Sequence, residues 1–246
     1  MKFKPVFFIL LGLLSFLLAP FTLKILAAKE PSRITCPDGD TFVIIEREVV
    51  EISHDETVKG DLIIIDLRKL RLTLYRHGKV LRTYPVAIGE PETPSPIGEW
   101  KIIHKGGNWG DGFGVRWMGL NVPWGIYGIH GTNKPWTIGS QASHGCIRMF
   151  NRNVLELYDL VKPGTPVHIT GDIPKVNPRR EIARNNTGRD VVTIQFILRN
   201  LNCEPGTADG RFGAAMEDAV YRLQRYYGLP LHGKITLNEQ YLIRLR

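Results

Sequence analysis

Residues 142–149 of the chain, ASHGCIRM, place a histidine, a cysteine and an arginine within one short segment. A cysteine attacks acyl carbons as the thiolate, so a nucleophilic Cys146 needs a nearby group that accepts the thiol proton. Two histidines are candidates: His144, two residues before the cysteine, and His130 in the segment YGIHGTNK. Adjacent side chains on a strand or sharp turn point in different directions, so the sequence leaves open whether His144 reaches the sulfur. We expect the base to be His130, brought alongside from a neighbouring strand.

The residues beside Cys146 suit the same chemistry. Gly145 has no side chain, which would let the backbone amides of residues 145 and 146 face a developing oxyanion. Arg148 offers a planar guanidinium for a substrate carboxylate. A structural cysteine, buried as a small hydrophobe in a glycine-rich loop, is the competing interpretation. The chain contains neither a C-x-x-C nor an H-x-x-x-H pair, so we expect no metal site.

The segments that must position these residues are mostly strand-like up to about residue 171. The run DLIIIDLRKLRLTLYRHGKVLRTYPVAIG alternates apolar and polar residues, and its RHGK stretch predicts a hairpin turn. Leu70, Leu72, Leu74 and then Val80 lie on the apolar positions of this alternation. Short strands separated by Gly and Pro predict a mainly β, sandwich-like domain.

A helix is expected directly after the cysteine motif. The segment NRNVLELYDLVKPG carries Val154, Leu157, Tyr158 and Val161 on one face, with Asn151 or Asn153 as the cap.

The hydrophobic pattern changes again after residue 190. Residues 172–190 are basic and polar, which predicts a linker. Residues 191–246 then show helical spacing in VVTIQFILRNLNC, GAAMEDAVYRLQRYYGL and TLNEQYLIRLR. We expect a small all-α domain of three helices there.

The N-terminus predicts export. Lys2 and Lys4 precede a run from Pro5 to Leu23 without a charge, which is long enough for a signal peptide or a spanning helix. We assign residues 1–28 to a signal peptide or an uncleaved signal-anchor helix, with the anchor favoured, and residues 29–60 to a tether and strand-rich lead-in. The protein would then act in the cell envelope, either membrane-anchored or secreted to the wall.

The bulk composition adds little to this. The net charge of +8 over 246 residues fits a polyanionic environment such as a cell wall or a membrane surface, or simply a solvated basic surface. An exported chain with three cysteines leaves at least one thiol unpaired. Cys36 and Cys203 could pair and leave Cys146 free.

The segment IHGTNKPWTIGSQASHGCIRM closely resembles the signature of L,D-transpeptidases with a YkuD-like catalytic domain. The strands IIIDLRKLRLTLYRHGKVLRTYPVAIG, the TPSPIGEWKI segment and GVRWMGLNV resemble other parts of that domain, which we place at residues 61–171. The resemblance implies that Cys146 is the acylated nucleophile and His130 the general base. It also implies that the Gly131 carbonyl orients the imidazole, in the role that a carboxylate plays in other triads.

The resemblance assigns further residues to the site. His144, Gly145 and the Cys146 amide would form the oxyanion region, while Ser143 and Arg148 would support the loop and the substrate. Tyr127 and Trp136 would contribute to the pocket walls.

The implied reaction is formation of 3→3 cross-links in peptidoglycan without a cofactor. Cys146 would take an acyl group from a tetrapeptide stem, release D-alanine, and pass the acyl group to an amine of a neighbouring stem. Water as the acceptor would make the enzyme an L,D-carboxypeptidase, and a non-catalytic wall-binding protein is the other alternative. Carbapenem-type β-lactams would acylate Cys146. We expect a monomer and no nucleic-acid partner.

The C-terminal segment resembles the three-helix peptidoglycan-binding module. DGRFG at 209–213, AVYRLQ and GLPLHGKI occur in the order found in that module. Asp209 would cap a turn and Phe212 would fill the small core. Met216 and Leu223 depart from the residues common in the module, which leaves open whether the domain binds glycan or serves as a spacer.

Overall fold

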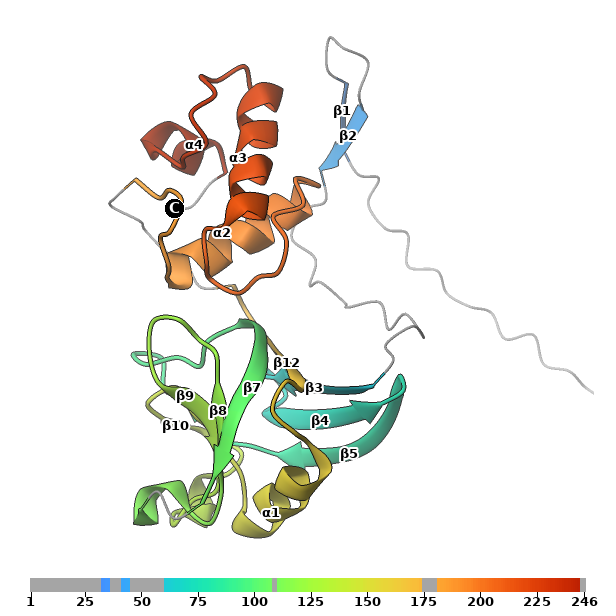
Figure 1. Cartoon of the computed structure of the whole chain (residues 1–246), viewed down its shortest axis with the longest axis vertical. Helices are drawn as coiled ribbons and strands as arrows, with labels where there is room; N and C mark the ends of the chain where they lie inside the picture. The colour runs from blue at the N-terminus through green and yellow to red at the C-terminus, as the bar shows by residue number, and fades with distance from the viewer. Residues whose placement is uncertain (1–31, 36–40, 45–59, 108–109, 174–180, 244–246) are drawn as a thin grey trace, which may run out of the picture. The chain divides into compact units, whose positions relative to one another are not determined.

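The computed structural model describes residues 32–35, 41–44, 60–107, 110–173 and 181–243 (Figure 1). Residues 1–48 form a unit of their own, in which β1 (Ser32–Thr35) pairs antiparallel with β2 (Thr41–Ile44). The expected signal or anchor helix and Cys36 lie outside the described residues. No helix in the described ranges is long and apolar enough to cross a membrane.

A three-strand meander opens the β domain: β3 (Asp61–Asp66), β4 (Arg71–Arg76) and β5 (Lys79–Pro85). The predicted hairpin turn lies at His77 and Gly78, with φ of 50° and 74°. Positive φ at both central residues is typical of the two-residue turns that match strand twist. Leu72 and Leu74 are fully buried as expected, but Val80 is 60% exposed. The register shifts between Leu74 and Tyr75, and this irregularity turns Val80 to the outside.

The sheet has eight strands in the order β11-β9-β8-β7-β12-β3-β4-β5. The second half of the domain supplies β7 (Gly98–Gly106), β8 (Trp117–Leu120), β9 (Tyr127–His130), β11 (Ile147–Arg148) and β12 (Pro166–Thr170). A separate parallel pair joins β6 (Ile88–Gly89) to β10 (Gln141–Ser143).

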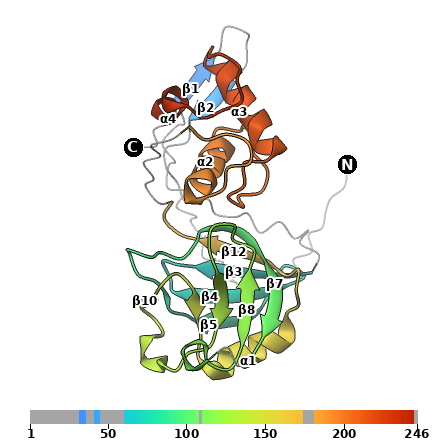
Figure 2. The same cartoon turned by 60° about the vertical axis from the view of Figure 1, so that its left-hand side comes forward.

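The domain is one curled sheet with a small strand pair, where the sequence predicted a sandwich. Strand β7 is the reason, because its first half pairs with β12 and its second half with β8. This long strand carries the sheet through a bend, so β8 and β9 run across the direction of β4 and β5 (Figures 1 and 2). The core inside the bend includes Trp100, Ile63, Ile65, Leu72, Met118, Ile129, Ile147 and Met149.

Helix α1 (Asn151–Leu160) follows β11 at the predicted place and buries Val154 and Leu157. Neither predicted asparagine caps it: the cap position is Phe150, without a side-chain bond. The Asn151 amide oxygen instead accepts a hydrogen bond from the Thr132 backbone amide at 3.1 Å. The first residue of the helix therefore fixes the loop after β9. Two short 3-10 helices, η1 (Asp111–Phe113) and η2 (Pro135–Thr137), lie in the loops flanking β8 and β9.

The C-terminal module contains α2 (Arg189–Asn200), α3 (Ala214–Tyr226) and α4 (Leu237–Leu242) around a second apolar core. Phe212 is 1% exposed within this core, as predicted. Asp209 accepts from the Arg211 backbone amide, the local turn expected of it. The packed part of the module begins earlier than the expected boundary at residue 191. Ile182, within the expected linker, is fully buried and pairs with Ile235.

Candidate active site

Strand pairing brings the two predicted reactive residues to adjacent positions. Strand β11 runs parallel to β9, with Ile147 opposite Ile129 and Arg148 opposite His130. Cys146 directly precedes β11, so it lies beside Gly128, two residues from His130 on the same strand. Residues two apart on a strand face the same side, so the thiol and the imidazole share one face of the sheet. The Cys146 Sγ lies 4.0 Å from the Ile126 carbonyl oxygen.

The backbone before Cys146 requires glycine. Gly145 has φ +110°, a conformation that side chains disfavour. A Cβ at this position would lie 2.7 Å from Cε1 of Tyr127. The tyrosine ring therefore packs directly on the peptide that leads into Cys146, and both the turn and this contact depend on the missing side chain.

Ser143 closes the turn around Gly145. Its hydroxyl donates to the Cys146 carbonyl at 2.6 Å and accepts from the Gly145 amide at 3.1 Å. This differs from our expectation that the Gly145 amide would face an oxyanion, because that donor is already used within the turn. The Cys146 amide is the remaining candidate of the two.

The TPSP segment supports the same turn from outside. The Glu90 amide donates to the Ser143 carbonyl at 2.9 Å, and the Thr93 hydroxyl donates to it at 3.3 Å. Gly89 leaves room for this approach, since a Cβ there would lie 2.3 Å from the Thr93 carbonyl oxygen. The cysteine turn is thus held by hydrogen bonds on both sides.

His130 is held on three sides. Its Nδ1 lies 2.5 Å from the Gly131 carbonyl oxygen, and a carbonyl can only accept, so Nδ1 carries the proton and Nε2 is the unprotonated nitrogen of the neutral ring. The Trp117 ring stacks on the imidazole at 5.4 Å, and Phe113 meets it edge-on at 5.1 Å. The histidine is 2% exposed.

Burial dominates the electrostatics of both groups. It lowers the pKa of His130 to about 4, although hydrogen bonds with Gly131 and Phe113 oppose this and the Arg148 charge adds to it. Burial also raises the pKa of Cys146, against the Gly128 backbone amide and the Arg148 charge. At neutral pH the resting pair is therefore a neutral imidazole beside a protonated thiol.

The carbonyl that anchors His130 is itself fixed by α1. A Cβ on Gly131 would lie 2.2 Å from Oδ1 of Asn151, the same atom that accepts from the Thr132 amide. The fixed tautomer of His130 therefore depends on the close approach of the helix start to the loop after β9.

Comparison with known proteins shows which family the chain resembles. The model of the L,D-transpeptidase catalytic domain matches residues 60–169, and that of the "Putative peptidoglycan binding domain" matches residues 187–238. "Putative L,D-transpeptidase YqjB" of Bacillus subtilis is 34% identical over 134 residues, which cover 48% of this chain and 76% of the relative. The chain belongs to the L,D-transpeptidase family.

Other L,D-transpeptidases are similar over the same region. "Putative L,D-transpeptidase YkuD" of Bacillus licheniformis is 45% identical over 108 residues, covering 44% of this chain and 64% of the relative. The chain thus spans just under two thirds of the length of that protein. The solved catalytic domain of the Enterococcus faecium L,D-transpeptidase is 27% identical, with 46% of this chain and 98% of that one covered and a TM-score of 0.40.

The remaining residues that the L,D-transpeptidase signature assigns are placed differently from one another. Tyr127 lies against the Cys146 turn, whereas His144 is exposed and Trp136 of η2 is 76% exposed. Arg148 donates from Nη1 to the Ala142 carbonyl at 2.8 Å, which braces the turn. Its Nε is buried, and among the described residues it has no hydrogen-bond partner.

The sequence offered no reason to place His104 near the candidate site. In the structure its Nε2 accepts from the Trp117 indole at 3.0 Å. Gly119 makes room for it, since a Cβ there would lie 2.2 Å from the His104 ring. His104 therefore anchors the ring that stacks on His130. The only signal in the sequence was its position two residues after Ile102 on β7. Nothing in the sequence pairs His104 with Trp117.

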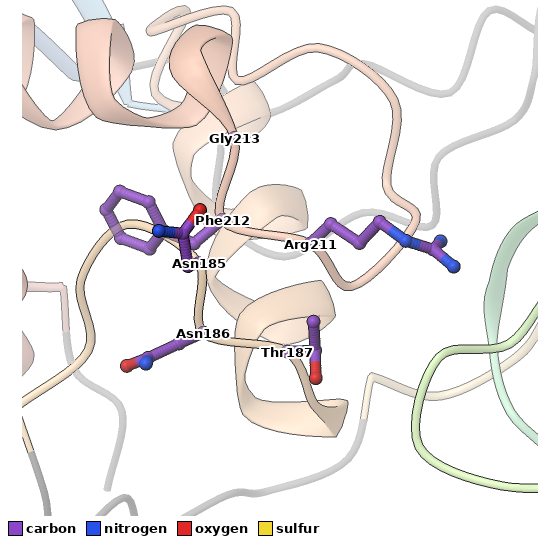
Figure 3. A pocket seen from close by; sticks show the side chains of 6 residues that line it. All are labelled: Asn185, Asn186, Thr187, Arg211, Phe212 and Gly213. Atoms are coloured by element: carbon purple, nitrogen blue, oxygen red, sulfur yellow. The ribbon is translucent and has the colours of Figure 1, made fainter.

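The described residues contain no group of three or more His, Cys, Asp or Glu side chains that could hold a metal ion. A hollow of about 300 Å³ lies on the helical module, away from the cysteine turn (Figure 3). It is lined by Asn185, Asn186, Thr187, Arg211, Phe212 and Gly213. Figure 3 shows Arg211 extending away from Asn185 and Asn186, so these polar groups do not converge on one point.

Proposed function

We propose that the protein is an L,D-transpeptidase of the cell wall that forms 3→3 cross-links through a Cys146 thioester. One observation supports this most directly: a buried, neutral imidazole, whose Nδ1 proton the Gly131 carbonyl holds, lies one strand away from the thiol, on the same face of the sheet. A general base must be unprotonated at the working pH, and a pKa of about 4 keeps His130 in that state.

The first acyl transfer would begin with the neutral pair. His130 Nε2 takes the thiol proton as Sγ attacks the carbonyl that joins the stem's diamino acid to its terminal D-residue. The Cys146 amide stabilises the oxyanion. The C–N bond then breaks, the imidazolium returns the proton to the leaving amine, and D-alanine departs from the thioester.

The second transfer reverses these roles. An amine of a neighbouring stem attacks the thioester, His130 accepts its proton, and the C–S bond breaks to release the cross-linked product. The proton returns to the sulfur, so no metal or organic cofactor is needed for the balance. The buried Arg148 Nε is suited to a carbonyl or carboxylate oxygen of the substrate.

Two neighbouring functions share the first step. Water in place of the amine would make the enzyme an L,D-carboxypeptidase. A non-catalytic wall-binding protein would retain the fold without thioester formation. The complete set of a nucleophile, a base and a carbonyl anchor favours an enzyme over a scaffold.

The other domains fit action outside the cytoplasm. We propose that the helical module binds peptidoglycan and that residues 1–28 export the chain and anchor it if they are not cleaved. A relative has been solved as "LD transpeptidase LdtMt1 in complex with imipenem". By analogy, we propose that carbapenems acylate Cys146, with the protein acting as a monomer.

The deciding experiment uses the chain from residue 29 with soluble disaccharide-tetrapeptide and with purified sacculi. Mass spectrometry of the products should show loss of D-alanine and a 3→3 linked dimer, together with an acyl adduct on Cys146. Tripeptide alone would favour the carboxypeptidase. Unchanged substrate with no adduct would contradict any enzymatic function.

A further inference from the structure

The helical module and the catalytic domain share packing. Val192 of α2 is 1% exposed and belongs to the apolar core that the curled sheet forms, and Phe196, one helical turn later, packs against that core. A module acting only as a tether would not need to place a helix residue in the core of its neighbour. Apolar packing across an interface opposes independent movement of the two parts, and Val192 and Phe196 supply such packing here.

Hydrogen bonds and an ion pair fix the same boundary. Arg199 of α2 bonds both carboxylate oxygens of Glu99 on β7, at 2.5 Å and 3.2 Å. Glu99 also makes two hydrogen bonds with the backbone of Ala208: its amide donates to the Ala208 carbonyl at 2.9 Å, and its side-chain Oε2 accepts from the Ala208 amide at 3.1 Å. Bidentate pairing of this type fixes orientation as well as distance.

Trp124 contacts both the helical module and a residue of the candidate active site. The backbone of Gly210 lies against its ring, since a Cβ there would be 2.3 Å from Cζ3 of Trp124 and 2.9 Å from Cγ2 of Val192. The same ring contacts Tyr127 with centroids 6.5 Å apart. Tyr127 packs on Gly145, next to the nucleophile.

A second path starts from the same ring. Trp124 meets Trp100 edge-on at 5.4 Å, and the Trp100 indole donates to the Pro96 carbonyl at 2.9 Å. Pro96 belongs to the TPSP segment, whose Thr93 hydroxyl bonds the Ser143 carbonyl. Both supports of the cysteine turn, Tyr127 and the TPSP segment, are therefore in contact with the Trp100–Trp124 pair.

We propose that the helical module positions the active site: its docking on Trp124 holds Tyr127 and the TPSP segment against the Gly145–Cys146 turn. Trp124 is then a positioning residue, and the module acts on the reaction even when the substrate is not part of a wall. This inference rests on the proposed transpeptidase activity. Displacement of a reacting group by about 1 Å costs up to about 100-fold in rate, so a small shift of this turn is measurable.

Charge reversal of the Glu99–Arg199 pair tests this positioning role in the chain from residue 29, which keeps both domains. The variants are Glu99→Arg, Arg199→Glu and the double reversal. Arg184→Glu is the matched control, because it breaks an ion pair with Glu217 inside the module. The readouts are the rate of Cys146 acylation by imipenem and kcat/KM on soluble disaccharide-tetrapeptide, with thermal unfolding to confirm folding. Arg199→Gln replaces any reversal that does not fold.

We expect each single reversal to lower both rates by about 5- to 10-fold, a size typical of coupling between sites. The double reversal should recover only part of the loss, because an arginine at position 99 cannot accept from the Ala208 amide, and Arg184→Glu should match the wild type. Single reversals that keep the wild-type rates on the soluble substrate would overturn the inference, as would a double reversal whose loss equals or exceeds the product of the two single losses. Absence of acylation in the wild type would instead reject the proposed function.

Discussion

Cys146 and Cys203 are two thiols whose pKa burial raises, yet they lie in different surroundings. Cys203 is 8% exposed in the core of the helical module, and its Sγ lies 3.6 Å from the Leu201 carbonyl oxygen. Cys146 lies at a strand start beside Gly128, with a neutral imidazole on the same face.

The comparison shows that acidity alone does not distinguish a nucleophile from a structural thiol here. Each sulfur is disfavoured as a resting thiolate. What separates them is a base that strand pairing brings within reach of one and not of the other, together with a turn that leaves that thiol partly accessible. In the proposed reaction, the thiolate of Cys146 therefore has to form as the substrate reacts.

The largest effect should come from exchanging the two thiols for alanine in turn. Cys146→Ala should lower transpeptidation by at least about 1,000-fold, since the loss of a nucleophile removes the covalent route. Cys203→Ala should keep the wild-type rate. Intact-protein mass spectrometry with imipenem provides the measurement. An adduct that persists in Cys146→Ala and disappears in Cys203→Ala would reverse the assignment.

An intermediate effect on activity is expected when glycines with similar backbone angles are replaced by alanine. Gly145 and Gly164 have φ of +110° and +92°, but only Gly145 has a neighbour, Tyr127, in the place of a Cβ. Both alanine variants should lose about 1–2 kcal/mol of unfolding free energy from backbone strain. Only Gly145→Ala should also lose activity, by about 100-fold, because the turn before Cys146 must move.

Thermal unfolding and kcat/KM on the soluble substrate separate the two costs. Equal loss of activity in both variants would show that the Tyr127 contact is not what holds the turn.

The smallest effect concerns His104 and the pH profile. Because the pKa of His130 is about 4, kcat/KM should be constant above about pH 5 and fall as the imidazole becomes protonated at lower pH. His104→Leu removes the acceptor for the Trp117 indole and should let water reach the imidazole. The pKa of His130 would then rise toward its ordinary value, and activity at pH 5.5 should drop by about 3- to 5-fold.

His104→Asn keeps an acceptor and serves as the control, with the wild-type acid limb expected. The measurement is kcat/KM from pH 3.5 to 8 on the soluble substrate. An identical acid limb in the leucine and asparagine variants would show that His104 has no part in shielding His130.

Local patterns predicted the parts of the molecule that short segments determine. The His77–Gly78 turn, the helix after the cysteine motif and the Phe212 plug each depend on a few neighbouring residues. The signature IHGTNK…SHGCIR predicted His130 and Cys146 as the reactive pair, and the structure places His130 on β9 and Cys146 directly before the adjacent β11.

What the sequence could not predict depends on contacts between distant segments. The curl of the sheet follows from β7 pairing with β12 at one end and β8 at the other, which no periodicity encodes. The hydrogen bond between His104 and Trp117 joins two strands, and the occupied Gly145 amide follows from the exact turn geometry at Ser143. The prediction that Val80 is buried was wrong for the same reason, because a bulge depends on the partner strand.

The Gly131 carbonyl that holds the imidazole has a consequence for genetics and for tolerance of acid. A peptide oxygen has no proton to gain in this range, so the anchor, unlike a carboxylate, persists however acidic the surroundings become. No codon change deletes it either, because every amino acid supplies the same atom. An alanine survey therefore cannot remove the oxygen itself, because Gly131→Ala acts only through a Cβ that would lie 2.2 Å from Oδ1 of Asn151. Replacement of the peptide bond after Gly131 by an ester would weaken the oxygen as an acceptor directly.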